Sequence, residues 1–126
     1  MKGKQKKGGM KMAELPNNEL PPKTCSIEKL VTNKKDVAKV LDGSKTATRR
    51  NGRYADIGEV MVLEGSEFVV ERVYAQTLGE LTDEHARQEG YGSVEEYKQS
   101  ILKFHPGMPW LPQMSVWVHE FAPVVN

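Results

Sequence analysis

The spacing of apolar residues in the first half of the chain predicts one short helix. Val37, Val40 and Leu41 recur at intervals of three and four residues, which is the period of a helix with one buried face. Asn33 precedes this run and is a favoured N-cap, and Gly43 follows it, where a glycine enters a left-handed C-cap without steric cost. We therefore expect a helix between Asn33 and Gly43.

Two more helices are predicted later in the chain. Thr82 is followed by Asp83 and Glu84, acids that the helix dipole favours in the first turn, and Gly90 marks the end of this helix. The sequence Ser-Val-Glu-Glu at residues 93–96 is a capping box that begins the next helix. The buried stripe of that helix comprises Val94, Tyr97, Ile101 and Leu102.

Extended segments account for most of the remaining sequence. Gly65 lies in a hairpin turn, whereas three prolines make residues 106–112 an irregular loop. The pattern as a whole predicts an α+β domain, a compact and partly open β-barrel with two or three short helices over its ends. The predicted strands cover residues 25–32, 46–50, 59–63, 68–77 and 115–121.

The N-terminal segment differs in composition from the rest. Residues 1–23 combine Lys, Gly, Pro and Asn with few large apolar side chains, so we expect a disordered lysine-rich extension before a domain at 24–126. The first thirteen residues carry five lysines and no acid, which leaves 13 basic and 17 acidic residues, a balance of −4, in the rest of the chain. This balance argues against a domain that holds nucleic acid mainly through phosphates, although not against a local basic pocket.

Length and cysteine content restrict the class of protein further. The 126 residues suit one domain, and Cys25 is the single cysteine of the sequence, which excludes an intramolecular disulfide. No basic start is followed by an apolar stretch long enough for a signal peptide or a membrane span. We therefore expect a monomer in a reducing cytoplasm, without membrane contact.

Candidate chemistry concentrates in the sequence Gly-Ser-Lys-Thr-Ala-Thr-Arg-Arg at residues 43–50. Lys45 follows the end of the helix, at a helix-to-strand corner where a side chain can enter a cleft. Arg49 and Arg50 can meet an anion or a base edge. The same mixture of residues is also typical of a solvated edge strand, and spacing alone leaves both interpretations open.

These residues carry a resemblance to a known family. Gly43, Lys45 and Arg50 match the Gly-x-Lys-x-x-x-x-Arg signature of the ASCH domain, a family with a PUA-like β-barrel. The chain is most similar in pattern to small bacterial N(4)-acetylcytidine amidohydrolases. The similarity covers roughly residues 26–121 and includes Asp56-Ile57-Gly58-Glu59, His85-Ala86-Arg87-Gln88-Glu89, Pro106-Gly107 and a last strand that ends in His119-Glu120-Phe121.

The resemblance implies three catalytic residues that act without a cofactor. Lys45 would be the proton acceptor, Thr48 the nucleophile and Glu89 the proton donor. The chain departs from these amidohydrolases in its lysine-rich start, its paired arginines and its longer loop around residue 110. We expect substrate contacts from Gly43, Arg49, Arg50 and Trp110.

Elementary chemistry sets conditions on these roles. A threonine hydroxyl is a weak nucleophile unless a base removes its proton, and a lysine is such a base only in its neutral form. Positive charge on Arg49 and Arg50 would favour the neutral amine of Lys45, whereas an apolar pocket would keep Glu89 protonated. Residues three apart on a strand point to opposite faces, so Lys45 and Thr48 converge only if the chain bends or bulges between them.

Two other features have competing interpretations. Trp110 can stack on a nucleobase or can plug the end of the barrel. His85 lies one helical turn before Glu89, a spacing that suits a metal ion, but the sequence offers no evident third ligand. We therefore expect no metal site.

Three functions are open at this point. The first is hydrolysis of an amide on a modified pyrimidine nucleoside such as N(4)-acetylcytidine. The second is RNA binding by a PUA-like module without catalysis, and the third is ribonuclease activity in the same basic cleft. A closed pocket would favour a small nucleoside as the partner, and an open basic groove would favour an RNA strand.

Overall fold

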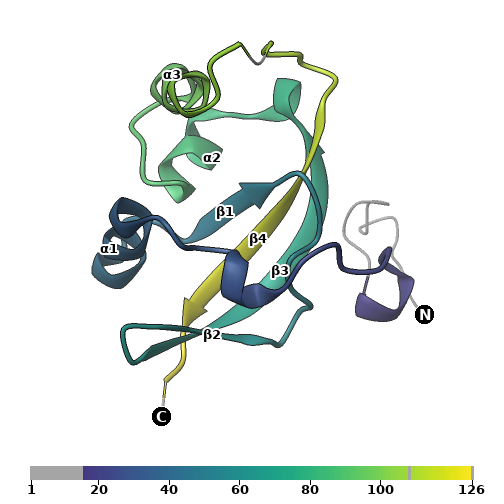
Figure 1. Cartoon of the computed structure of the whole chain (residues 1–126), viewed down its shortest axis with the longest axis vertical. Coiled ribbons are helices and arrows are strands. Elements are labelled where there is room, and N and C mark those ends of the chain that lie inside the picture. Colours follow the sequence, from purple (N-terminus) through teal and green to yellow (C-terminus); the bar gives the residue numbers. More distant parts are fainter. Residues whose placement is uncertain (1–15, 108, 126) are drawn as a thin grey trace, which may run out of the picture.

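A curled sheet of four antiparallel strands forms the centre of the computed structural model, which describes residues 16–107 and 109–125 (Figure 1). The strands lie in the order β1-β4-β3-β2, so β1 and β2 form the two edges. This half-barrel confirms the predicted α+β fold with a PUA-like, partly open barrel. The strands are β1 (Ala47–Arg50), β2 (Val60–Leu63), β3 (Ser66–Thr77) and β4 (Ser115–Pro123).

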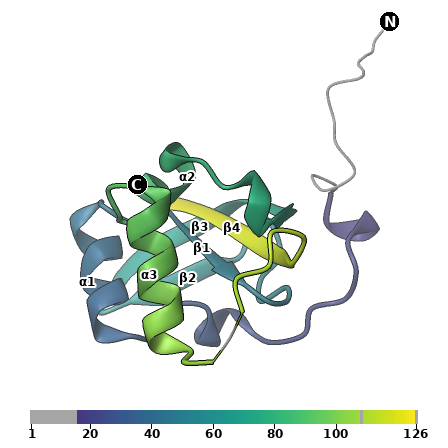
Figure 2. The same cartoon turned by 90° about the horizontal axis from the view of Figure 1, so that it is seen from above.

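Three α-helices surround the sheet in the described part of the chain. They are α1 (Lys34–Asp42), α2 (Asp83–Gln88) and α3 (Val94–Phe104). The first two views place α2 and α3 together over one end of the sheet, and α1 on the side where β1 is the edge (Figures 1 and 2). All three helices agree with the predicted ones.

The caps explain why the ends of α1 are predictable. The Asn33 side chain accepts hydrogen bonds from the backbone N–H groups of Lys35 and Asp36. Gly43 ends the helix with a φ of +89°, a conformation that a β-carbon would strain. Local chemistry therefore sets both ends of this helix.

The strand predicted over residues 25–32 is wrong. That segment contains a 3-10 helix at Ile27–Lys29 instead. Ile27, Leu30 and Val31 recur at helical spacing, and all three point into the core, with at most 9% of each exposed. Burial of these three side chains outweighs the β-propensity of the segment.

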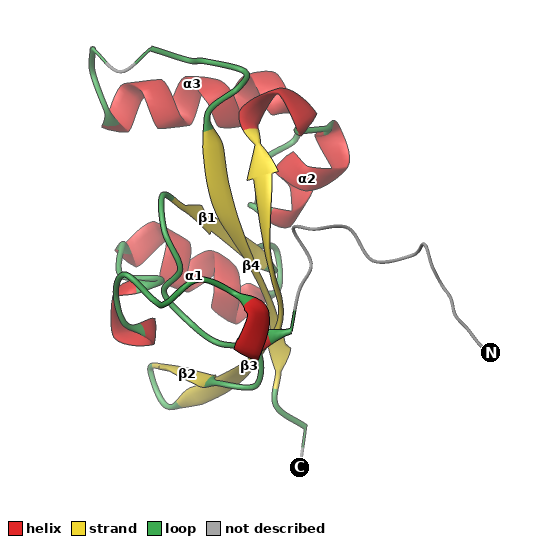
Figure 3. Ribbon diagram, turned by 90° about the vertical axis from the view of Figure 1, so that its right-hand side faces the viewer, coloured by secondary structure: helices red, strands yellow, loops and turns green. Residues whose placement is uncertain are grey.

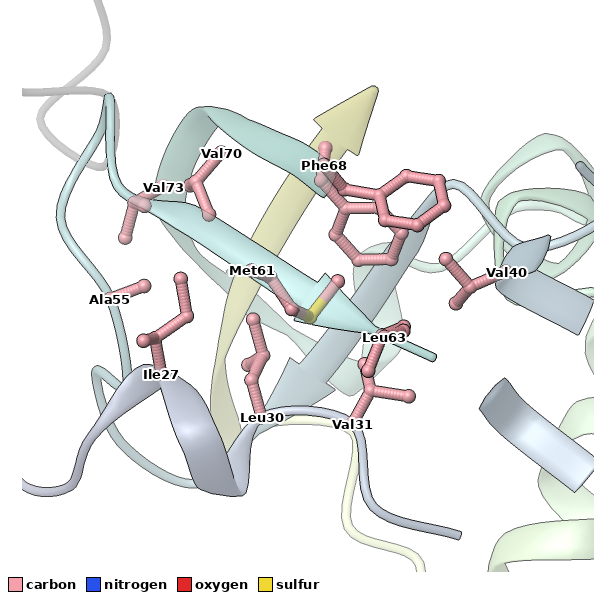
Figure 4. Close-up of a cluster of buried hydrophobic side chains, with 11 residues drawn as sticks. Ile27, Leu30, Val31, Val40, Ala55, Met61, Leu63, Phe68, Val70 and Val73 are labelled. Atoms are coloured by element: carbon pink, nitrogen blue, oxygen red, sulfur yellow. The ribbon is translucent and has the colours of Figure 1, made fainter. Parts of the chain in front are cut away.

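A cluster of eleven buried apolar residues fills the concave side of the sheet (Figure 4). Phe68 and Phe121 meet edge to face there, with ring centroids 6.4 Å apart. Side chains from three strands pack against side chains from the 3-10 helix. This packing holds the chain segments that precede α1 against the sheet. We call it the apolar cluster; its members are Ile27, Leu30, Val31, Val40, Ala55, Met61, Leu63, Phe68, Val70, Val73 and Phe121.

The described part of the predicted extension is in contact with the domain. The side chain of Asn17 accepts a hydrogen bond from the backbone N–H of Ile57 and donates one to the carbonyl of the same residue. Leu20 packs against the apolar cluster, and the buried Arg53 donates a hydrogen bond to the carbonyl of Pro21. The segment 16–23 therefore contacts the domain, whose helices and strands Figure 3 shows, and the predicted lysine-rich tail at 1–15 lies outside the described residues.

Candidate functional site

A buried ion pair joins the corner before β1 to the end of α2. The Nζ atom of Lys45 lies 2.6 Å from Oε1 of Glu89, and Nη1 of Arg49 lies 2.8 Å from Oε2 of the same carboxylate. The three side chains are at most 4% exposed. Two cations thus share one carboxylate away from bulk water, which strengthens their electrostatic interaction.

Backbone hydrogen bonds hold these two segments together. The N–H of Lys45 donates to the carbonyl of Lys39 in α1, and the N–H of Thr46 donates to the carbonyl of Gln88, next to Glu89. Because β1 begins only at Ala47, Lys45 lies before the strand and its direction does not follow strand alternation. Strand alternation therefore does not prevent Lys45 from lining the same cavity as Thr48.

The ion pair continues into a chain of polar side chains that the sequence did not suggest. Arg49 Nε donates to Gln76 Oε1 over 2.8 Å, and Gln76 Nε2 lies 3.4 Å from His85 Nε2. His85 Nδ1 in turn accepts from the backbone N–H of Thr82. Burial lowers the pKa of His85, which favours the neutral imidazole. Lys45, Arg49, Gln76, His85 and Glu89 are called the polar cluster below.

Lys45, Thr48 and Glu89 line one cavity of about 260 Å³, although they are distant in the sequence. Arg49 and Arg50 line it as well. The structure therefore brings together all three residues that the resemblance marks as catalytic. The remaining walls come from the start of α1, from α3 and from the segments beside them: Thr32, Asn33, Asp36, Tyr91, Tyr97, Ser100, Ile101, Phe104 and His105.

Thr48 is one of the residues that line this cavity. The residue is 4% exposed, and its side chain makes no hydrogen bond within the described part of the chain. On β4 its register partner is His119, a fully buried imidazole whose Nε2 accepts from the backbone N–H of Tyr54. Burial lowers the pKa of His119 to about 4, so this neighbour of Thr48 is neutral near neutral pH.

Arg50 lies between two cavities and is already held in place. Its Nε and Nη2 atoms both donate to the carbonyl of Leu30, and its guanidinium lies 5.7 Å from the ring centroid of Tyr54. It lines the first cavity and also a second one of about 380 Å³. Arg50 therefore places a fixed positive charge where the two cavities share a wall.

Gly43 and Trp110 do not line the first cavity. Gly43 borders a separate hollow with Val40 and Phe68, and its role in the structure is the C-cap of α1. Trp110 lines the second cavity, in the loop between α3 and β4. The expected direct substrate contact of Gly43 is therefore not supported by its position, whereas that of Trp110 depends on whether a ligand enters the second cavity.

The spacing of His85 and Glu89 does not produce a metal site. His85 faces Gln76 and Thr82, while Glu89 faces Lys45 and Arg49. No group of three or more His, Cys, Asp or Glu side chains is arranged to hold a metal ion in residues 16–107 and 109–125. Over the same residues, none of the helices is long and apolar enough to span a membrane.

Two residues, one from the polar cluster and one from the cavity wall, could not be identified from the sequence. Gln76 stands in a strand that is rich in charged and polar residues, and nothing in its neighbours along the chain indicates a partner 27 residues away. Tyr97 was expected in the buried stripe of its helix and is indeed buried, but its contact with the cavity could not be foreseen. Only the strand alternation that places Gln76 on the face opposite Val73 offered a signal.

Comparison with known proteins supports the fold and little more. No model of a protein family matches the chain, and no curated protein sequence matches it. Among solved structures, the ASCH domain from Lactobacillus crispatus JV V101 is similar, with a TM-score of 0.59, 14% sequence identity, and coverage of 71% of this chain and 70% of that chain.

A protein of Enterococcus faecalis V583, assigned to the family DUF984, is similar to the same extent. Its TM-score is 0.58 at 16% identity, and the match covers 81% of this chain and 74% of that chain. The predicted ASCH-like fold is confirmed by these two structures. At such low identity the similarity extends to the fold alone.

Proposed function

We propose that this chain, which has the fold of an ASCH domain, hydrolyses an amide on a modified pyrimidine nucleoside such as N(4)-acetylcytidine. One observation carries the proposal: a lysine, a glutamate and a threonine line the same small cavity, and the first two are in direct contact. A base, an acid and a nucleophile within reach of one substrate are what amide cleavage requires.

The contact between Lys45 and Glu89 would allow the proposed reaction to begin with the transfer of one proton between them. Over 2.6 Å, one proton can lie on the amine or on the carboxylate. When it lies on Lys45, the pair is ionic and neither group can perform its step. When it lies on Glu89, the amine is a base and the carboxylic acid is a donor, so the neutral pair is the reactive form.

The reaction then proceeds in two stages. Lys45 takes the proton of the Thr48 hydroxyl while Oγ1 attacks the amide carbon, and Glu89 donates its proton to the amide nitrogen as the carbon–nitrogen bond breaks. Cytidine leaves with its free amine, and the acetyl group remains on Thr48 as an ester. Water then attacks the ester and gives up a proton to Glu89, the acetyl group leaves as acetic acid, which ionises to acetate, and the proton held by Lys45 returns to Oγ1 of Thr48.

Arg49 has a supporting role in this scheme. It holds Glu89 through Nη1 and is held by Gln76 through Nε, so the carboxyl group keeps one orientation while its proton moves. The positive charge of the guanidinium also remains beside Lys45 throughout. An arginine suits this task because it does not exchange its proton near neutral pH.

The size of the cavity favours a nucleoside over an RNA strand as the group that enters it. About 260 Å³ lies near the lower end of the roughly 300–1,000 Å³ found for pockets that hold small ligands. The negative balance of residues 14–126 argues against binding that depends mainly on phosphate contacts along a long strand. A module that only binds RNA would also have no use for a buried base paired with a buried acid.

The test is the release of cytidine and acetate from N(4)-acetylcytidine by the full chain. Lys45→Arg keeps the charge but cannot serve as a base, so it should abolish the reaction, whereas Lys35→Arg, on an exposed residue of α1, should not change it. Activity that persists in Lys45→Arg would show that Lys45 is only a cation. Binding of single-stranded RNA by a wild-type chain that releases no cytidine would favour the RNA-binding function instead.

A further inference from the structure

The second cavity has a lining that the proposed reaction does not use. It is larger than the first, at about 380 Å³ against about 260 Å³, and three aromatic side chains line it: Tyr54, Tyr97 and Trp110. Aliphatic and sulfur-containing side chains complete most of the wall, namely Leu78, Ile101, Met114 and Val116. Such a wall suits a flat and largely apolar ring.

The two cavities are neighbours that share part of their lining. Both are lined by Arg49, Arg50, Tyr97, Ile101 and His105, so a ligand in one lies against the same side chains as a ligand in the other. The first cavity presents the groups for amide cleavage, and the second presents aromatic faces. A ligand that fills both must therefore carry a polar reacting group and a second planar ring.

Positive charge is concentrated where the cavities meet. Arg50 is fixed at the junction by its two hydrogen bonds to Leu30, and its position does not depend on a ligand. Arg49, also at the junction, keeps one buried terminal nitrogen, Nη2, without an acceptor in the described residues. Lys98 lies 5.7 Å from the ring centroid of Trp110. A group that joins two rings across this junction should carry negative charge.

We propose that the second cavity binds the base of the nucleotide adjacent to the modified cytidine, so that the preferred ligand is a short single-stranded oligonucleotide and not the free nucleoside. The inference rests on the proposed function, because it assumes that the modified cytidine occupies the first cavity. In an oligonucleotide, a phosphodiester with one negative charge joins two nucleosides that each carry a flat base. The base would lie against the aromatic wall of the second cavity, and the phosphodiester would lie near the arginines that line both cavities. Stacking on aromatic side chains is the usual mode of contact with unpaired bases.

Trp110 gives the proposal its sharpest test, because a stacking residue and a structural plug respond differently to substitution. Trp110→Ala removes both the ring and the bulk. Trp110→Leu keeps apolar bulk but removes the flat ring, and Trp110→Phe keeps a ring. Leu111→Ala is the matched control, since Leu111 is the next residue and lines neither cavity.

The measurement is calorimetric binding of a cytidine trinucleotide and of cytidine to the full chain. The unmodified bases are products of the proposed reaction, so no turnover disturbs the titration. We expect the wild type and Leu111→Ala to bind the trinucleotide at least about tenfold more tightly than Trp110→Leu does, which is the affinity of one stacked base. Trp110→Phe should retain most of the affinity, and cytidine itself should bind all variants alike.

Two results would overturn the proposal: equal trinucleotide affinity of the wild type and Trp110→Leu, or no advantage of the trinucleotide over cytidine in the wild type. If Trp110→Ala unfolds, Trp110→Leu and Trp110→Phe still decide the question. Release of cytidine from free N(4)-acetylcytidine, measured in parallel, tests the proposed function separately. Its absence would end the hydrolase assignment without changing the binding result, and the control Leu111→Ala should leave this release unaltered.

Discussion

The apolar cluster and the polar cluster are both buried, but on opposite faces of the same sheet. Val73, His119 and Phe121 point to the concave side, whereas Arg49 and Gln76 point to the other side, because side chains alternate along each strand. The apolar cluster gains free energy from every side chain removed from water. The polar cluster must first compensate for the desolvation of three charged groups, so its contribution to stability is small even though its contacts are short.

Burial alone therefore does not show whether a region stabilises the fold or carries out chemistry. A buried ion pair is retained with little or no gain in stability compared with apolar residues of similar volume. When such a pair also lines a cavity with a hydroxyl, chemistry is the simpler explanation of its presence. Substitutions on the two faces should therefore separate stability from activity.

The largest effect is expected when one partner of the polar cluster loses its charge. Glu89→Gln leaves Lys45 and Arg49 buried without a counter-charge, so the free energy of unfolding should fall by about 3–5 kcal/mol, measured by urea denaturation. The triple substitution Lys45→Met, Arg49→Leu and Glu89→Leu should recover most of that loss while abolishing hydrolysis. A triple variant that is as unstable as Glu89→Gln would mean that the ion pair is needed for the fold.

On the opposite face, Phe68→Ala should act on stability only. The side chain is 5% exposed and meets Phe121 in the apolar cluster, so its removal should lower the free energy of unfolding by about 3–5 kcal/mol. At a temperature where the variant is still folded, kcat for cytidine release should match that of the wild type. A folded variant with much lower kcat would connect the two faces more closely than the structure suggests.

The sequence predicted the helices more completely than the network of contacts in the candidate site. Caps such as Asn33 and Gly43, and the three- and four-residue spacing of Val37, Val40 and Leu41, act locally, so they can be recognised from neighbouring residues. The exception is the 3-10 helix at residues 27–29. In that segment the helical spacing of the buried residues indicates the observed structure better than their β-propensity does.

The candidate site depends on contacts across long sequence distances. Lys45 and Thr48 could be found from a short motif, but Glu89 required the resemblance, because its partner is 44 residues away. Gln76 and His85 were missed as members of the site, since a glutamine in a strand and a histidine in a helix carry no local mark of a buried network. Tertiary structure alone brings these groups together.

His119 allows a test that depends on pH. Its pKa is lowered to about 4 in the folded protein from an unfolded value near 6.5 because of burial, with the charges of Arg53 and Arg50 acting in the same direction. Between these two pH values the imidazole binds a proton in the unfolded chain but not in the folded one. The free energy of unfolding should therefore fall by about 3 kcal/mol as the pH falls from about 6.5 to about 4. Above pH 6.5 His119 should cause no change in stability.

The comparison for this test is His119→Gln, whose side-chain oxygen can still accept from the N–H of Tyr54. Urea denaturation at several pH values should give a smaller acid loss in the variant than in the wild type. The carboxyl groups contribute equally to both curves, so the difference reports the imidazole. Parallel curves for the two proteins would contradict the buried neutral histidine.

The smallest effect is expected at Gly43, which separates a cap from a substrate contact. The φ of this residue is +89°, and no other atom lies within 4 Å of the place that a β-carbon would take, so Gly43→Ala should lower stability by about 1 kcal/mol through backbone strain alone. Gly43→Asn should cost less, because asparagine tolerates this conformation better. KM for N(4)-acetylcytidine should be unchanged in both variants, and a clear rise would restore the expected substrate contact.

The rate at which Thr48→Val hydrolyses N(4)-acetylcytidine tests directly whether the Thr48 hydroxyl is the nucleophile. Valine keeps the shape of threonine and removes only the hydroxyl, and Thr46→Val makes the same change at an exposed residue of the same segment. We predict that cytidine release falls to background in Thr48→Val, is retained in part in Thr48→Ser and is unchanged in Thr46→Val. Wild-type rates in a folded Thr48→Val protein would contradict the assignment of this cavity as an active site.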